Sequence, residues 1–243
     1  MMKAKLRVMK IANKLIKGKF LERPNRFITL ISINDQTVKS HLPDPGRLKE
    51  LLIPGETVYV QPVPEESKRK TRYSTLLVEN NGHLISLNTM LPNRFIRTHF
   101  SMIPMFKNWS ILRKEVPIGH HRLDFLLEDS EGNEVFTEIK SVTFVSNKVA
   151  KFPDAVTDRG KKHANLLAKL SMEGKKTLIL FVCQRSDAEE FKPMWARDPA
   201  FGNALKMAHQ SGVDVRCITT NISLKEMIYS KEIPVNLNHS HED

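Results

Sequence analysis

The sequence predicts a mixed α and β protein in two parts, an N-terminal β-barrel and a domain in which strands and helices alternate. Its 243 residues suffice for one large domain or two modest ones. Residues 18–88 hold short strand-like runs separated by glycine and proline, whereas strand-length and helix-length patterns alternate after Glu115. The two halves also differ in charge.

The first part has the pattern of a small barrel. Its clearest strand-like runs are residues 27–33 and 57–60, and Asn81-Gly82 joins residues 73–79 to 83–87 as a hairpin. Several short strands with basic side chains between them are typical of a barrel of the oligonucleotide-binding (OB) kind. We therefore expect residues 1–90 to form an OB-like barrel, followed by a helical or irregular connector over residues 91–110.

The second part, residues 91–243, has the pattern of an α/β layer with a central mixed sheet. The expected elements are strands at 121–127 and 135–145, a helix at 157–172, a strand at 177–183, a helix at 199–210 and a strand at 213–218. Gly174 is expected to end the first helix, and Asp198-Pro199 is a strong start for the second. Cys183 and Cys217 fall in predicted strands, so we expect them to pack in the core.

The charge of the chain is concentrated in its first half. Lys and Arg total 38 against 27 Asp and Glu, a net charge of +11. Residues 1–110 hold 19 basic and 8 acidic side chains, which gives +11, whereas residues 111–243 hold 19 of each, which gives zero. This asymmetry indicates a polyanionic partner. Nucleic acid is favoured over a membrane surface, because no basic amphipathic helix, apolar span or signal peptide stands out, and a soluble, cytoplasmic protein is expected.

Two acidic residues and a lysine form the most informative pattern. Between the strands at 121–127 and 135–145, the polar residues 128–134 predict a turn with its tip near Glu131. Facing residues of such a hairpin sum to about 262, as Asp124 and Glu138 do. Their carboxylates are then expected on one face, and Lys140, two residues after Glu138, shares that face.

These three groups match the chemistry of metal-assisted phosphodiester hydrolysis. Two carboxylates can hold Mg²⁺ or Mn²⁺, and Lys140 can orient a water or stabilise the developing anion. Glu115 is a candidate third acid, with a surface charge beside Arg113 and Lys114 as an equal alternative. A zinc site is disfavoured because no cysteine and histidine cluster is present. Glycoside hydrolysis is disfavoured because a nearby lysine would lower the raised pKa that a general acid needs.

Four motifs resemble those of a known family. They are HLPDPGRLKEL at 41–51, RLDF at 122–125, EIKSVT at 138–143 and FPDAVTDRGKKH at 152–163. In this order they resemble the sugar fermentation stimulation protein A family across nearly the whole chain. The resemblance implies an OB-like barrel, a restriction-endonuclease-like domain of the PD-(D/E)xK kind, non-specific DNA binding and a regulatory role in sugar metabolism. It also implies that Asp124 and Glu138 bind a divalent metal and that Lys140 assists the attacking water.

The candidate DNA contacts are basic or aromatic residues in both parts. In the barrel they are Arg23, Arg26, Arg47, Arg69, Lys70 and Arg72, with Tyr73 able to stack on a base. In the second part, Thr157 or Asp158 is expected to cap a helix whose first turns bring Arg159 and His163 to a bound phosphate.

Two functions remain open from the sequence. The first is a metal-dependent nuclease that grips DNA with its barrel. The second is a DNA-binding regulatory factor whose nuclease-like domain does not cut. The oligomeric state is left open.

Overall fold

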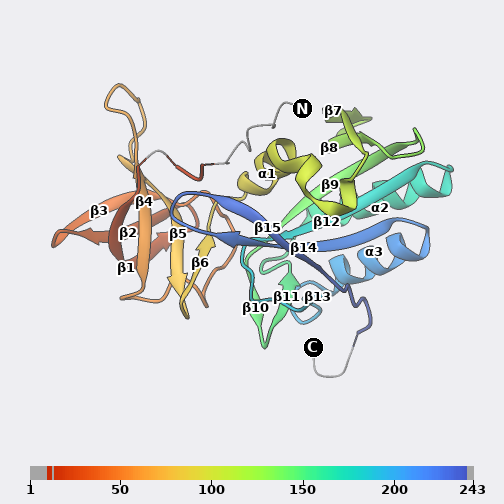
Figure 1. Cartoon of the computed structure of the whole chain (residues 1–243). Helices are drawn as coiled ribbons and strands as arrows, with labels where there is room; N and C mark the ends of the chain where they lie inside the picture. Colours follow the sequence, from red (N-terminus) through yellow and green to blue (C-terminus); the bar gives the residue numbers. More distant parts are fainter. Residues whose placement is uncertain (1–9, 13, 240–243) are drawn as a thin grey trace. The chain divides into compact units, whose positions relative to one another are not determined.

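The computed structural model describes residues 10–12 and 14–239, and the chain divides into two compact units (Figure 1). The first unit is Met1–Leu91 with Asn221–Ile228, and the second is Pro92–Thr220 with Tyr229–Asp243. The short segment Asn221–Ile228 joins the first unit although it lies late in the sequence; Glu226 forms an isolated antiparallel bridge with Lys10.

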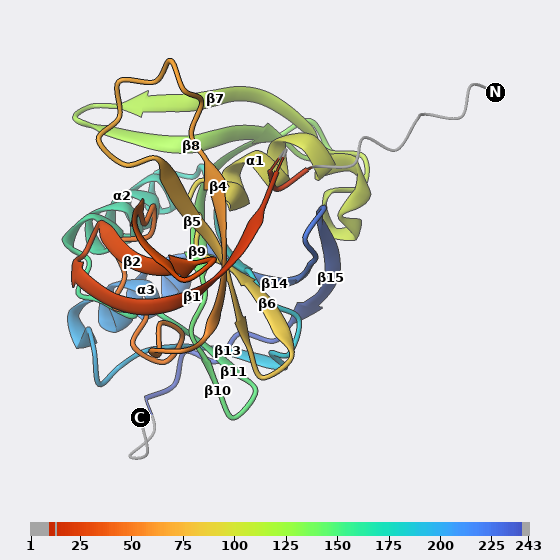
Figure 2. The ribbon, with the colours of Figure 1, turned by 90° about the vertical axis from the view of Figure 1, so that its left-hand side faces the viewer.

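The first unit contains the expected barrel. Its strands are β1 (Ile16–Asn25), β2 (Ile28–Ile33), β3 (Gln36–His41), β4 (Thr57–Pro62), β5 (Tyr73–Asn80) and β6 (His83–Ser86). They are ordered β3-β2-β1-β4-β5-β6, and a parallel pairing of β3 with β5 closes the ring. Figure 2 shows β1 curving past both β2 and β4, and its pairing with β2 shifts register twice, as such curvature requires. The Asn81-Gly82 turn, with both residues at positive φ, confirms the predicted hairpin.

Three buried hydroxyl groups form hydrogen bonds with one another where the barrel closes. The Thr75 side chain lies 2.8 Å from the Thr29 hydroxyl and donates to the Ser40 hydroxyl at 2.8 Å. All three residues are fully buried, on β5, β2 and β3 respectively. Buried hydroxyls are stable only when they are hydrogen-bonded, so the three groups depend on one another.

The second unit is built on the expected mixed sheet. The elements that lie wholly or mostly within it are α1 (Leu91–His99), η1 (Phe100–Met102), η2 (Pro104–Phe106), β7 (Ser110–Ile118), β8 (His121–Glu128), β9 (Glu134–Val142), β10 (Val145–Ser146), β11 (Val149–Phe152), α2 (Asp158–Met172), β12 (Lys176–Cys183), β13 (Glu190–Pro193), α3 (Pro199–Gln210), β14 (Asp214–Ile222) and β15 (Met227–Ile233). The large sheet is ordered β15-β14-β12-β9-β8-β7, with β9, β12 and β14 parallel and β7 and β8 antiparallel to their neighbours. Helices α2 and α3 lie side by side and pack into its core (Figure 1). Among the described residues, no helix is long and apolar enough to cross a membrane.

The β8–β9 hairpin has the predicted register. Its pairs run from Glu128↔Glu134 to Phe125↔Thr137, and each sums to 262. The predicted end of the second strand is wrong, because β9 stops at Val142 and Val145 belongs to β10, in a separate small sheet with β11 and β13. A continuous apolar run does not reveal where a strand leaves its sheet.

One aspartate organises the turn of this hairpin. Asp129 accepts the backbone N–H groups of Glu131 and Asn133, each at 2.9 Å, and the ammonium of Lys176 at 2.7 Å. These donors, with Lys176 foremost, hold the pKa of Asp129 far below its ordinary value. The ionised carboxylate therefore fixes the turn that sets the register of Asp124 and Glu138.

We expect Thr75→Val to lower the free energy of unfolding by about 1–3 kcal/mol, because it leaves the hydroxyls of Thr29 and Ser40 without their shared partner. Urea denaturation followed by circular dichroism measures the change. Thr37→Val, at an exposed position of β3, is the matched control and should change stability by less than about 0.5 kcal/mol. Equal effects of the two substitutions would contradict a structural role for the hydroxyl group.

Asp129 should make the stability of the protein depend on acid pH. Because its folded pKa is depressed, its contribution is fully present above its ordinary pKa of 3.8 and is lost as the pH falls below that value towards the folded pKa. Asp129→Asn should therefore lower the melting temperature at pH 7, and the difference from the unsubstituted protein should shrink as the pH falls below about 4. A constant difference from pH 7 to pH 3 would refute the assignment.

Candidate metal centre and nucleic-acid surface

Glu138 is a buried carboxylate on the central strand β9, with 3 % of its surface exposed. Its Oε1 accepts from Lys140 Nζ at 2.7 Å and faces His163 Nδ1 at 2.5 Å. Burial raises the pKa of Glu138, but the hydrogen bond from His163 and the charge of Lys140 outweigh burial and hold it below its ordinary value. Glu138 therefore stays ionised, and its Oε2 is buried without a hydrogen-bond partner.

Asp124 reaches the same site from β8. Its Oδ2 accepts the backbone N–H of Ile139 at 2.8 Å, and its Oδ1 accepts from the side chain of Asn93 on α1 at 2.9 Å. Burial, followed by the negative charge of Glu138, raises the pKa of Asp124 to about 6. Two carboxylates that repel each other in a buried site are typical of a position that a cation stabilises.

The donor atoms at this site suit a hard cation. A buried carboxylate oxygen without a partner is costly unless a positive charge meets it, and both Glu138 Oε2 and Asn93 Oδ1 are buried without a hydrogen bond. Over residues 10–12 and 14–239, no group of three or more histidine, cysteine, aspartate or glutamate side chains could form a metal cage. A cation here would need water or phosphate oxygens to complete its coordination.

His163 is brought to Glu138 by the start of α2. Of the two expected caps, Thr157 and Asp158, Thr157 takes this role, and its hydroxyl accepts the N–H of Gly160 at 3.0 Å. A Cβ at Gly160 would lie 2.7 Å from a Thr157 methyl carbon, so this turn needs glycine. The buried Asp198 caps α3 through Phe201 N–H at 2.9 Å and also accepts the N–H of Thr157 at 2.8 Å. One carboxylate therefore holds both helix starts together.

The geometry revises two of the expected roles in this unit. His163 is 3 % exposed and faces Glu138, so it belongs to the carboxylate site and is unavailable to a DNA backbone, whereas Arg159 on the same helix is exposed. Glu115 lies on β7 at a φ of +53°, and its largely exposed carboxylate pairs with Arg122 at 2.8 Å. With this backbone conformation, Glu115 is not among the paired residues of β7 and β8. Its side chain forms a surface ion pair instead.

The expected DNA contacts of the barrel are mostly exposed. They comprise Arg26, Arg47, Arg69, Lys70 and Arg72, with Tyr73 half-buried at the start of β5. Arg23 differs, because its guanidinium donates to the backbone carbonyls of Arg26, Asp44, Gly46 and Arg47. Its geometry is that of a clamp between the β1–β2 turn and the loop after β3.

One site residue was missed by the sequence interpretation. Asn93 holds Asp124, but an asparagine in the first turn of a connector helix carries no signal of such a contact. His163 was singled out for a phosphate, and its i+4 spacing from Arg159 gave no indication that it faces a buried carboxylate.

Comparison with known proteins decides the family. Residues 21–87 match the family model for the SfsA N-terminal OB domain, and residues 90–226 match that for the sugar fermentation stimulation protein RE domain. The chain belongs to the SfsA family. A sugar fermentation stimulation protein homolog from Desulforamulus reducens is 37 % identical over 225 residues, covering 92 % of this chain and 93 % of the relative.

Two further SfsA relatives are similar to this chain over most of its length. The Acetivibrio thermocellus homolog is 37 % identical over 232 residues and covers 93 % of this chain and 99 % of its own. The solved structure of Pyrococcus furiosus SfsA in complex with Ca²⁺ superposes with a TM-score of 0.84 at 32 % identity, covering 94 % of this chain and 99 % of that one. The OB-like barrel and the restriction-endonuclease-like second domain are therefore the SfsA architecture.

Asp198→Ala should lower the free energy of unfolding by about 2–4 kcal/mol, because it removes the acceptor of two helix starts. Asp198→Asn retains one acceptor oxygen and should restore part of that loss. The matched control is Asp158→Ala, in the exposed first turn of α2, which should lower the free energy of unfolding by less than about 0.5 kcal/mol. Urea denaturation measures both changes. Comparable losses at Asp158 and Asp198 would count against the shared cap.

Proposed function

We propose that this SfsA-family chain binds DNA and hydrolyses its phosphodiester bonds with a divalent metal ion held by Asp124 and Glu138. One observation carries the proposal. Glu138 keeps a depressed pKa in a buried site, while its Oε2 has no partner and lies in the same site as a second carboxylate. Such an arrangement favours binding of a cation.

The choice of metal follows from the donor atoms. The P. furiosus relative was solved in complex with Ca²⁺, which supports a site for a hard cation in this family. Carboxylate and water oxygens also suit Mg²⁺ and Mn²⁺, which we propose as the working ions. When bound, such an ion acts as a Lewis acid and lowers the pKa of a coordinated water.

The residues around the carboxylates have distinct roles in this proposal. Lys140 and His163 occupy Oε1 of Glu138, which leaves Oε2 as the oxygen available to a cation. Asn93 and the N–H of Ile139 hold the Asp124 carboxylate in position. The ammonium of Lys140, 12 % exposed, also brings a positive charge to a site that receives a phosphate anion.

The barrel supplies affinity for DNA in this account. The exposed Arg26, Arg47, Arg69, Lys70 and Arg72 are proposed to contact phosphates, in the half of the chain that carries the whole net charge. Arg159, exposed at the start of α2, is proposed as a contact near the carboxylates.

A second candidate function is DNA binding without cleavage, with a regulatory role. The observation that favours it is the engagement of Lys140, which is bonded to Glu138 rather than free to orient a water. Glu115, the candidate third acid, is paired with Arg122.

Incubation of supercoiled plasmid with Mg²⁺ or Mn²⁺ separates the two candidates. We expect metal-dependent nicking or linearisation that EDTA abolishes. Asp124→Ala should slow cleavage by about 100-fold or more, because it removes a proposed metal ligand. Fluorescence anisotropy with labelled DNA should give an affinity within about twofold of the unsubstituted protein, since phosphates are held elsewhere.

Glu115→Ala serves as the matched control, because its carboxylate is engaged with Arg122 and cleavage should be unaffected. Absence of cleavage with either metal, alongside retained DNA binding, would leave the regulatory candidate. Cleavage that persists in Asp124→Ala would point to a different site.

A further inference from the structure

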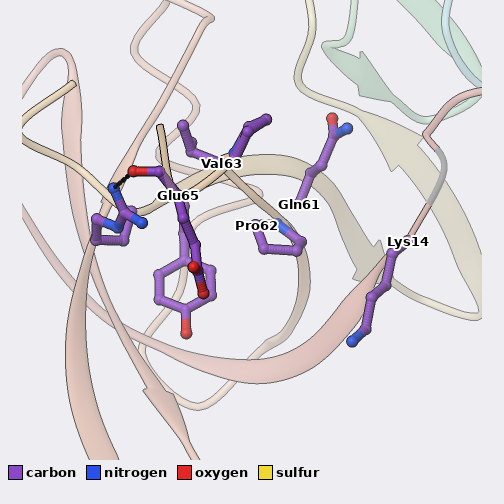
Figure 3. A pocket seen from close by; sticks show the side chains of 8 residues that line it. Lys14, Gln61, Pro62, Val63 and Glu65 are labelled. Carbon is purple, nitrogen blue, oxygen red and sulfur yellow. Dashed lines mark hydrogen bonds between the residues drawn. The ribbon is translucent and has the colours of Figure 1, made fainter. Parts of the chain in front are cut away.

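The barrel unit contains a hollow of about 430 Å³ beside the β4–β5 loop. It is lined by the end of β4, by residues of the loop and by Lys14 just before β1, with Tyr73 at the start of β5 (Figure 3). This volume lies within the range of about 300–1,000 Å³ typical of small-ligand sites.

The frame of the hollow is fixed by backbone contacts. Pro62 and Tyr73 face each other in the β4–β5 pairing, and the N–H of Val63 donates to the carbonyl of Arg72 at 2.8 Å. The guanidinium of Arg72 donates to the carbonyl of Glu65 at 3.3 Å, which ties the two sides of the loop together. The hollow is therefore formed before any ligand enters.

Two charged side chains of the hollow are free to meet a ligand. Across the part of the chain that the structure describes, neither the ammonium of Lys14 nor the carboxylate of Glu65 has a hydrogen bond or ion pair. In Figure 3 Pro62 lies between these two side chains. Opposite charges that line one hollow without pairing suit a ligand that has both an anionic group and a hydrogen-bond-donating edge.

The side chains match the parts of a nucleotide. Tyr73, half-buried, offers a ring on which a base can stack, and Lys14 and Arg72 carry the charges that a phosphate needs. The carboxylate of Glu65 can only accept hydrogen bonds. Among the four DNA bases, guanine alone presents two adjacent donors, N1–H and N2–H, on its Watson–Crick edge, and it does so only when unpaired.

From these contacts we propose that the hollow binds one unpaired guanine nucleotide of single-stranded DNA. Tyr73 stacks on the base, Glu65 accepts from its Watson–Crick edge, and Lys14 and Arg72 bind the phosphate. The inference rests on the proposed DNA binding and adds a preference for guanine and for single-stranded over double-stranded DNA. The site is separate from the Asp124–Glu138 carboxylates and works without a metal.

The test measures binding of the full chain to labelled thymine strands of about 16 nucleotides, the upper end of what one such barrel covers. The central base is guanine, adenine or hypoxanthine, which lacks the N2 amino group. Fluorescence anisotropy at fixed salt with EDTA should give a Kd about fivefold lower for guanine than for adenine, and an intermediate Kd for hypoxanthine. Glu65→Gln should abolish this preference, so that the guanine, adenine and hypoxanthine strands bind with equal Kd.

Glu66→Gln is the matched control, since Glu66 is an exposed acid of the same loop and does not line the hollow. It should keep the preference for guanine. Equal affinity for the three strands, or a preference that survives Glu65→Gln, would overturn the inference. Tighter binding of the same sequence as RNA, with the same dependence on Glu65, would also overturn the assignment to DNA. If neither these strands nor a duplex binds, the proposed DNA binding fails as well, whereas duplex binding without a guanine preference refutes the inference alone.

Discussion

The second domain is built around a buried negative charge. Glu138 lies on the central strand of the sheet, where an ionised carboxylate without partners would cost several kcal/mol. Lys140 on the same strand and His163 on α2 both contact one of its oxygens, and together they keep the group ionised. The other oxygen is left unpaired, so the contact that stabilises the charge also determines which atom is proposed to bind a cation.

This contact depends on the position of α2 relative to β9. Thr157 caps the helix, Gly160 gives it the close turn that the cap requires, and Asp198 joins it to the start of α3. The motif FPDAVTDRGKKH therefore has a structural explanation, in which its histidine is a hydrogen-bond partner of the buried carboxylate. The exposed Arg159, one turn earlier, is the proposed phosphate contact of this helix.

Much of the fold and part of the site could be predicted from the sequence. Polar turn residues and strand patterning fixed the register of Asp124 and Glu138, because side chains alternate between the faces of a strand. The predicted end of β9 was wrong, because the point at which a strand leaves its sheet depends on its pairing partners and not on how apolar its residues are. Asn93 and the inward direction of His163 come from packing between elements far apart in the chain. Such contacts leave no local pattern in one sequence.

In the proposed metal site, Asp124 and Glu138 together hold a divalent cation. Crystals of the protein grown with Mn²⁺, and measured at a wavelength where manganese scatters anomalously, test this directly. We expect an anomalous peak within coordination distance of Glu138 Oε2 and of the Asp124 carboxylate, and we expect this peak to be lost in crystals of Asp124→Ala. A peak elsewhere in the chain, with none between these two carboxylates, would contradict it.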